Sequence, residues 1–482
     1  MEQGNGQRHA SGGFQQIVQR EQGLHRSLKP AQLAMIAIGG AIGTGLFMGS
    51  GFAIGFAGPG VLLSYAIGAL VTLLLMGCLA EMTVAHPTSG SFGAYAEHYV
   101  SPLAGFLVRY AYWASIVLAV GTEVTAVALY MGYWFPQVPA WFWIISFSAA
   151  LILINLVGVG IFGAVEYLFS MVKIIAIVAF ILVAAYIVFG APGSTGSGAA
   201  GAGFHHYTAH GGFLPNGLWG MWVAVIVSIF SYLSIEMIAV AAGEAQDPER
   251  AVLQAFRSTM IRLGLFYLLT LALMLAIVPW NQAGAQKSPF VQVMEAIHVP
   301  GAAAIINFVV LIAALSAMNS QLYITTRTMF SLARAGQAPR SFGAVSKRGI
   351  PVRALLLSSI GIALATGLNV FYPGDAFLLM MAISMFGALF TWFMIFVTHY
   401  RFRRQWAAVG NRPLAFRMRG FPVLTLLGAG MLLAIMLTTL FTDAFRMTLL
   451  TGIPFLAVLS VAYLLRFRHR AEPTPLPAND AA

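Results

Sequence analysis

Long apolar runs separated by short polar stretches dominate the pattern of hydrophobic positions along this chain. A helix that crosses a bilayer needs about 20 apolar residues. Twelve runs meet this need, and they begin near Ala31, Gly60, Pro102, Ala140, Ala164, Gly217, Thr259, Ala302, Ala354, Asp375, Pro422 and Phe445. The pattern therefore predicts an all-α integral membrane protein with twelve transmembrane helices. One further segment, Thr88 to Val100, is amphipathic and too polar to span, so we expect it at the cytoplasmic surface.

The first predicted span is weak at its centre. Between Met35 and Phe52 it carries six glycines, and Gly43 and Gly45 flank the hydroxyl of Thr44. Glycine costs roughly 1 kcal/mol relative to alanine inside a helix, so this composition does not suit a simple anchor. Irregular backbone at membrane depth is tolerated where protein or a water-filled cavity covers it, and N–H groups freed there suit a carboxylate. We predict a substrate site in a membrane transporter at Gly43, Thr44 and Gly45.

The sixth predicted span carries a polar cluster, from Phe230 to Glu236, within an apolar helix. Spans 1 and 6 are five spans apart and so cross the membrane in opposite directions. Interrupted segments at matching positions of two halves indicate an inverted-repeat transporter with its site at the repeat interface. The alternative for span 6 alone is a serine-rich packing face, because serine is common between membrane helices.

The net charge of +11 would by itself suggest a nucleic-acid partner, but the distribution of the charges over the predicted spans gives another explanation. With a cytoplasmic N-terminus, 22 of the 26 Lys and Arg residues fall on the inner side, and Lys287 and Arg446 fall outside. Arg109 and Lys173 lie within spans. This is the positive-inside rule, and it predicts that both termini are cytoplasmic. The basic charge is thus an effect of topology, and we expect no nucleic-acid partner.

Composition narrows the class further. The chain is 59% hydrophobic and 9% charged, which excludes an ordinary soluble protein. Its single cysteine, Cys78, excludes an intrachain disulfide and a cysteine-based metal site. His205, His206 and His210 share a long outer loop and could bind a metal, but no acidic or cysteine residue accompanies them, which favours a solvated loop.

The domain organisation follows from the spans. Residues 1–30 and 467–482 are predicted to be cytoplasmic tails, and 31–466 form the transmembrane domain. The N-terminal tail lacks the apolar core and cleavage site of a signal peptide.

Lysine 173 is the most unusual charge in the predicted spans. It lies seven residues beyond Glu166 on span 5, which places it about 10 Å deeper in the membrane. Ionisable residues at this depth are rare and indicate function by default. Lys173 could release a proton during a transport cycle or stand where another transporter holds a sodium ion; the alternative is a permanently paired structural lysine. Glu166 is expected near an interface, in a structural role.

Two carboxylates are further candidates. Glu123 lies deep in span 3, and Glu236 follows the break in span 6. Either could carry a proton, and Glu236 could instead cap the second half-helix or act in gating. Arg109 is expected to extend its charge to the cytoplasmic surface.

These features resemble a known family over about residues 20 to 466. The segments that carry the resemblance are Gly39 to Phe47, Ala57 to Gly60, Ala80 to Met82, Gly90 to Phe92, Met171 to Ile175, Ala242 to Arg250, and Asn319-Ser320. In this order they resemble the amino acid–polyamine–organocation superfamily, and within it the bacterial amino acid permease branch. The resemblance implies a LeuT-like fold of five plus five inverted helices, with helices 1 and 6 discontinuous and two C-terminal helices added.

The resemblance also implies roles for individual residues. N–H groups around Thr44 and Gly45 would hold a substrate carboxylate, carbonyls of Ala41, Phe230, Ser231 and Leu233 its ammonium, and Phe230 would cover the site. Lys173 matches a lysine that replaces sodium in proton-dependent relatives, and Glu236 matches a gating position. The full set of candidates is Ala41, Ile42, Gly43, Thr44, Gly45, Phe230, Ser231, Leu233 and Ser234 for substrate, and Lys173, Glu123 and Glu236 for coupling or gating.

One departure concerns specificity. The family commonly has glycine where this chain has Ser234, so we expect a narrower side-chain pocket or an added hydrogen bond. Gln321 stands where a small residue is common, and it either reaches the cavity or serves packing.

We therefore predict a proton-coupled importer of a neutral amino acid in the bacterial inner membrane, working by alternating access. Its partners would be the amino acid, protons and the lipid bilayer, and we expect no cofactor, no metal and no enzymatic activity. Proline, an aliphatic or aromatic amino acid, and 4-aminobutyrate all remain open as substrates. The alternative is an amino acid exchanger without net proton coupling.

Overall fold

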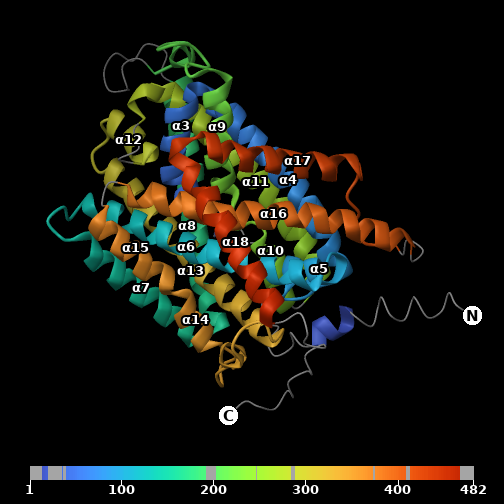
Figure 1. The fold of residues 1–482 in the computed structure, drawn as a ribbon. Coiled ribbons are helices and arrows are strands. Elements are labelled where there is room, and N and C mark those ends of the chain that lie inside the picture. Colours follow the sequence, from blue (N-terminus) through green and yellow to red (C-terminus); the bar gives the residue numbers. More distant parts are fainter. Residues whose placement is uncertain are drawn as a thin grey trace, which may run out of the picture.

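The computed structural model describes residues 14–19, 35, 40–190, 202–245, 247–283, 288–372, 375–408 and 413–466. Most of the two predicted tails lies outside these ranges. Every regular element within them is helical (Figure 1). The longer helices are α4 (Val61–Ala85), α6 (Pro102–Gly132), α7 (Ala140–Val157), α8 (Val159–Phe189), α9 (Gly217–Tyr232), α11 (Pro248–Ile277), α13 (Ala302–Arg334), α15 (Ile360–Phe371), α16 (Ala376–Ala408), α17 (Val423–Thr438) and α18 (Arg446–Arg466).

Shorter elements connect the long helices or interrupt them. They are η1 (Gly45–Gly49), α3 (Ser50–Ala57), η2 (Gly58–Gly60), α5 (Ser91–Tyr99), η3 (Phe204–Tyr207), α10 (Met237–Ala241), η4 (Ala242–Glu244), η5 (Trp280–Gln282), α12 (Pro289–Ala296), η6 (Arg340–Gly343), α14 (Val352–Ser358), η7 (Thr439–Phe441) and η8 (Asp443–Phe445). The predicted amphipathic segment is α5, which packs against α6 and α16.

Ten helical stretches of the described chain are long and apolar enough to cross a membrane. The first of them, Gly45–Ala85, has 41 residues. That is roughly 60 Å of helix, about twice the thickness of a hydrocarbon core. It bends at Gly58, whose φ of +59° suits glycine, before Pro59. In α11 the apolar part is the shorter stretch Gly264–Ile277. The structure thus supports a multi-span helical membrane protein.

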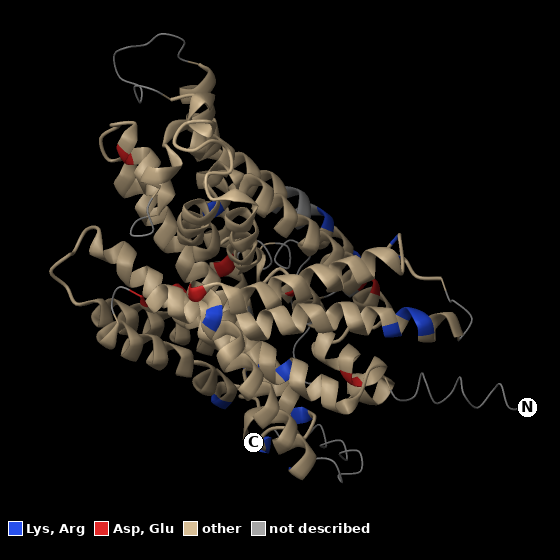
Figure 2. Cartoon of the chain, turned by 45° about the horizontal axis from the view of Figure 1, so that its top comes forward, with Lys and Arg blue, Asp and Glu red and all other residues tan. Residues whose placement is uncertain are grey.

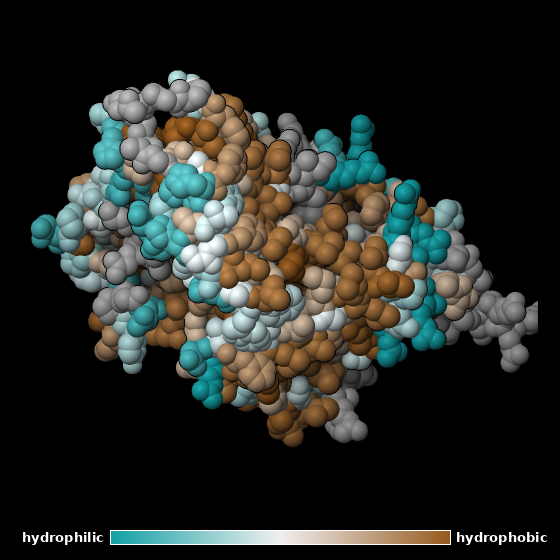
Figure 3. Space-filling view, turned by 90° about the horizontal axis from the view of Figure 1, so that it is seen from above, coloured by the Kyte–Doolittle hydropathy of each residue, from teal (hydrophilic) through white to brown (hydrophobic). Residues whose placement is uncertain are grey.

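The outer helices expose large apolar side chains, as a lipid-facing surface requires. Leu153 of α7, Leu182 of α8 and Leu465 of α18 are 62%, 65% and 81% exposed. Figure 3 shows a broad apolar surface on one face, with hydrophilic residues towards its edges. The centre is formed by α6, which packs against α13, α15 and α16. Figure 2 shows Lys and Arg mainly towards the end of the bundle that carries the C-terminus, and several acidic residues within it.

Arg109 does not extend to the surface as the sequence predicts. It is 1% exposed, and its Nη1 pairs with Glu97 Oε2 of α5 at 2.6 Å. A buried arginine needs such a partner, because an unpaired charge in the interior is very costly. The prediction was wrong because the partner lies on the separate helix α5.

Residues 14–19 form a short helix beside α5 (Figure 1). The Phe14 ring lies 4.0 Å from the His86 ring and 5.4 Å from the His98 ring, and Phe14 is 4% exposed. His86, which follows α4, shares a hydrogen bond with the Tyr99 hydroxyl at 2.5 Å. Burial, with a smaller contribution from His98, lowers the pKa of His86 to about 4. The N-terminal segment is thus anchored on an imidazole that stays neutral at physiological pH.

Candidate functional site

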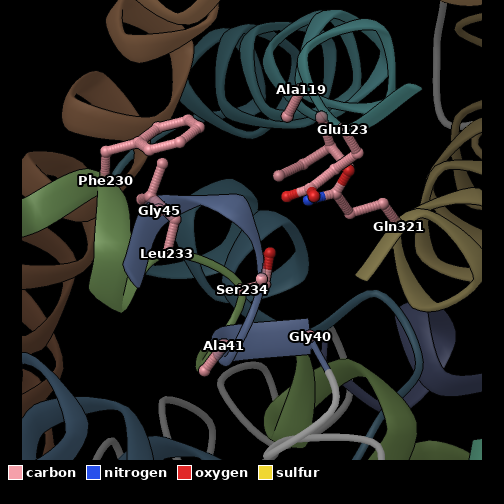
Figure 4. A pocket seen from close by; sticks show the side chains of 11 residues that line it. Gly40, Ala41, Gly45, Ala119, Glu123, Phe230, Leu233, Ser234 and Gln321 are labelled. Atoms are coloured by element: carbon pink, nitrogen blue, oxygen red, sulfur yellow. The ribbon is translucent and has the colours of Figure 1, made fainter. Parts of the chain in front are cut away.

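The first helix is interrupted where the glycines predict it. Residues 40–41 and the stretch from Thr44 onwards are helical, and Ile42 and Gly43 between them are not. The sixth helix is interrupted in the same way, because α9 ends at Tyr232 and α10 begins at Met237. The two breaks lie side by side and both line one pocket inside the bundle (Figure 4).

The pocket collects residues from four elements. Its lining comprises Gly40, Ala41, Gly43 and Gly45 of the first helix, Ile116, Ala119 and Glu123 of α6, Phe230, Leu233 and Ser234 at the second break, and Gln321 of α13. Figure 4 shows the Phe230 ring at one side of the cavity and Gln321 pointing towards Glu123. Six predicted substrate residues thus line the cavity. The other three, Ile42, Thr44 and Ser231, are fully buried behind them.

Three backbone groups at the first break have side-chain partners. Thr44 N–H donates to Glu123 Oε2 at 3.3 Å. The Ile42 carbonyl accepts from Lys173 Nζ at 3.0 Å. The Ala41 carbonyl lies 2.8 Å from the Tyr267 hydroxyl. Unpaired backbone groups in a buried break would cost several kcal/mol, so these contacts stabilise the interruption.

Lys173 is fully buried on α8 and reaches the first break from the side. Besides the Ile42 carbonyl, its ammonium donates to Ser316 Oγ of α13 at 2.8 Å. The lysine therefore connects the broken first helix to α8 and α13 through one positive charge.

The two breaks are held in close contact by glycines. A Cβ atom built on Gly45 would lie 2.7 Å from Ser231 Cα and 3.1 Å from the Phe230 carbonyl oxygen. A Cβ atom on Gly43 would lie 2.8 Å from Ala317 Cβ and 2.9 Å from Glu123 Oε1. Glycine is thus required here for close approach between elements, in addition to breaking the helix.

Two tyrosines that the sequence reasoning did not single out join the breaks. The Tyr267 hydroxyl of α11 lies 2.8 Å from the carbonyl oxygens of both Ala41 and Ser231. The Tyr65 hydroxyl of α4 lies 2.8 Å from Ser231 Oγ. Both side chains are fully buried. A polar hydroxyl within an apolar membrane helix was the available signal, but its partners are more than 35 residues away along the chain.

Comparison with known proteins decides the class of this site. The family model for amino acid permeases matches residues 32–472. The gamma-aminobutyric acid permease of Bacillus subtilis is 38% identical over 463 residues, covering 96% of this chain and 97% of that protein. The amino acid permease YtnA of the same organism is 36% identical over 445 residues, covering 92% and 96%. The aromatic amino acid transport protein AroP of Escherichia coli is 38% identical over 381 residues, covering 79% and 82%.

The chain belongs to the amino acid permease family. This confirms the predicted resemblance, and with it the class of transporter rather than enzyme. The permease is a multi-pass protein of a bacterial membrane. The pocket between the two breaks is the natural candidate for its amino acid site.

Glu236 of the permease is the last residue of the second break and does not line the pocket. It is fully buried, and its two carboxylate oxygens accept from the Tyr112 hydroxyl at 2.7 Å and from Trp392 Nε1 at 3.1 Å. It therefore joins the second break to α6 and α16, and these contacts, rather than a capping bond to α10, occupy its carboxylate.

Ser234 takes a backbone conformation that favours glycine. Its φ is +74°, its side chain is 1% exposed, and it lines the pocket opposite Glu123 and Gln321 (Figure 4). Residues other than glycine avoid this region because Cβ crowds the backbone. The serine hydroxymethyl group thus occupies cavity space at the cost of local strain.

The loop that carries His205, His206 and His210 is partly described, from residue 202 onwards. Among the described residues, no group of three or more His, Cys, Asp or Glu side chains is placed to hold a metal ion. His205 and His206 lie on η3. The last residue of η3, Tyr207, donates a hydrogen bond from its hydroxyl to the Ala272 carbonyl at 2.6 Å.

Proposed function

We propose that the permease imports a neutral amino acid together with a proton, by alternating access around the pocket between the two breaks. The observation that carries the proposal is the Lys173 ammonium on the Ile42 carbonyl, with Ser316 as its second partner. A cation here holds the two halves of the first helix in register with α8 and α13. Loss of its proton would weaken that contact by removing its charge, so protonation and the position of the first helix are coupled.

The Thr44 N–H supports a site for the substrate carboxylate. In this structure Glu123 occupies it, at 3.3 Å. Two carboxylates at one N–H repel each other unless one of them carries a proton. A substrate carboxylate arriving at Thr44 therefore favours a proton on Glu123, which links binding of the amino acid to uptake of a proton.

The substrate ammonium would face carbonyls of the second break. Phe230 and Leu233 line the pocket, and the Ala41 and Ser231 carbonyls, although in contact with Tyr267, retain a second lone pair each. The Phe230 ring, which is 7% exposed, would cover the bound molecule. The side-chain end of the pocket is bounded by Ser234 and Gln321.

The names of two relatives suggest which substrates to consider. One is named for gamma-aminobutyric acid and one for aromatic amino acids. We propose that the substrate is a neutral amino acid of one of these kinds, and that Ser234 limits the size of its side chain. We further propose twelve spans in a five-plus-five inverted repeat with two added helices, domain limits of 31–466, and both termini in the cytoplasm of an inner-membrane protein.

The test is uptake by proteoliposomes from a radiolabelled mixture of the twenty amino acids and 4-aminobutyrate, without sodium. The lumen is buffered alkaline or acidic relative to the outside. The proposal requires accumulation of one or a few compounds with an alkaline lumen and little with an acidic one. Uptake that is independent of the pH gradient and requires preloaded vesicles would replace symport with exchange.

A further inference from the structure

We infer that Glu166 receives the coupling proton from Lys173 through the hydroxyl of Ser316 and releases it towards the end of α8 at which the helix begins. This inference rests on the proton coupling proposed above. It assigns a function to a residue for which sequence reasoning predicts a structural role near an interface.

The first observation is the position of Glu166. It is fully buried on α8, seven residues before Lys173. Its carboxylate accepts a hydrogen bond from Ser316 Oγ and one from Asn319 Nδ2, the latter at 3.0 Å. Asn319 Oδ1 accepts in turn from Asn155 Nδ2 at 2.8 Å. Helices α7, α8 and α13 thus meet at this carboxylate.

The second observation is a continuous chain of donors and acceptors. Lys173 Nζ donates to Ser316 Oγ at 2.8 Å, and the Ser316 hydroxyl donates to Glu166 Oε1. All three side chains are fully buried. One hydroxyl therefore bridges the ammonium and the carboxylate, with both of its hydrogen bonds oriented from the lysine towards the glutamate.

The proton step along this chain is balanced. An N–H bond of Lys173 breaks as an O–H bond forms on Ser316, while the original O–H bond of Ser316 breaks and one forms on Glu166. The amine and the carboxylic acid are both neutral afterwards, and serine is unchanged. Lys173 then loses its charge-assisted contact with the Ile42 carbonyl, and the protonated Glu166 releases its proton to water when the helices open.

The third argument is the cost of a charge at this position. Neutral side chains that contact the Glu166 carboxylate are those of Ser316, Asn319, Ser320 and Ser170, the last at 3.5 Å. A purely structural acceptor could be a glutamine, since an ion costs far more to bury than an amide. Lys173 is the charge that faces Glu166, and Glu123 faces Lys173 from α6. A carboxylate can both balance the buried charge of Lys173 and accept its proton, and a glutamine can do neither.

Ser170 gives the chain an onward contact. Its hydroxyl lies 3.0 Å from the Met35 carbonyl, on the part of the first helix before the break. Movement of that half-helix would change the surroundings of Glu166 directly. The proton acceptor is thus next to an element that has to move when the transporter opens.

The experiment compares two transport modes of Glu166→Gln, with the amino acid that the wild type accumulates from the radiolabelled mixture. Exchange of internal for external substrate needs no net proton movement, whereas accumulation driven by a pH gradient does. We expect E166Q to keep exchange within about twofold of wild type and to lose at least tenfold in pH-driven accumulation. Glu166→Asp should restore part of the driven accumulation, and Glu295→Gln, an exposed position on α12, should leave both modes unchanged.

Every result decides the inference. Driven accumulation retained in E166Q overturns it, and so does an equal loss of both modes that Asp does not rescue, because that pattern marks a structural role. If E166Q cannot be purified folded, E166D is measured alone, and an unchanged pH profile of accumulation overturns the inference. If the wild type itself shows no pH-driven accumulation, the proposed function fails and this inference fails with it. If both the wild type and E166Q accumulate the amino acid when driven by the pH gradient, the proposed function stands and only this inference is overturned.

Discussion

The contact between the two breaks makes a sharp prediction for Gly45→Ala. The added Cβ would lie 2.7 Å from Ser231 Cα and 3.1 Å from both Ser231 N and the Phe230 carbonyl oxygen. All three are backbone atoms, so no side chain can rotate away. Carbon atoms in contact prefer about 3.5–4.0 Å, so the breaks must separate by most of 1 Å. Overpacking of this kind costs about 1–3 kcal/mol, which corresponds to roughly 5- to 150-fold in the population of the closed site.

The matched control is Gly55→Ala on the same first helix, because a Cβ at Gly55 meets nothing within 4 Å. Both variants are reconstituted at equal protein amounts, and initial uptake of the accumulated amino acid is measured. G45A should fall by about fivefold or more while G55A stays within about twofold of wild type. Equal uptake by G45A and wild type would refute the close contact of the breaks during transport.

Three further results follow from single contacts. Ser234→Gly removes the strain of a non-glycine residue at a φ of +74°, so it should raise the free energy of unfolding by about 1 kcal/mol, measured as a higher melting temperature, and admit bulkier substrates. A lower melting temperature would contradict this. Tyr267→Phe deprives the Ala41 and Ser231 carbonyls of their shared donor, and should cost about 1–3 kcal/mol in detergent melting; unchanged melting would exclude the bridge. Burial lowers the pKa of His86 to about 4, so between about pH 6.5 and pH 4 the unfolded state binds one proton more than the folded state. The contribution of His86 to the free energy of unfolding is therefore fully present above pH 6.5 and falls with acidification. The loss from pH 6.5 to 5 should be about 2 kcal/mol and absent in His86→Gln; an identical pH slope for both proteins would argue against it.

Sequence reasoning located the parts of the site that depend on local chemistry. The glycines around Thr44 and the polar cluster after Phe230 predicted both interruptions, and the structure has them at Ile42–Gly43 and between Tyr232 and Met237. Backbone breaks are visible in sequence because glycine content and helix propensity are properties of neighbouring residues.

The remaining features depend on distant partners. The Tyr267 bridge, the burial of Arg109 against Glu97 and the position of Glu166 between α8 and α13 are set by packing between helices far apart in the chain. The position of Glu166 along its own helix gave no sign that side chains of α13 cover it. The positive φ of Ser234 could not be predicted from the sequence for the same reason, because the packing of the break against neighbouring helices imposes this backbone angle.

The most direct test of proton-coupled transport is the lumenal pH of sodium-free proteoliposomes that contain a pH-sensitive dye. Addition of the transported amino acid outside should acidify the lumen of wild-type vesicles, and Lys173→Ala vesicles should show no acidification while still binding the substrate in a melting assay. Uptake of the amino acid by the wild type with no change in lumenal pH would contradict the account and identify the permease as an exchanger or a uniporter.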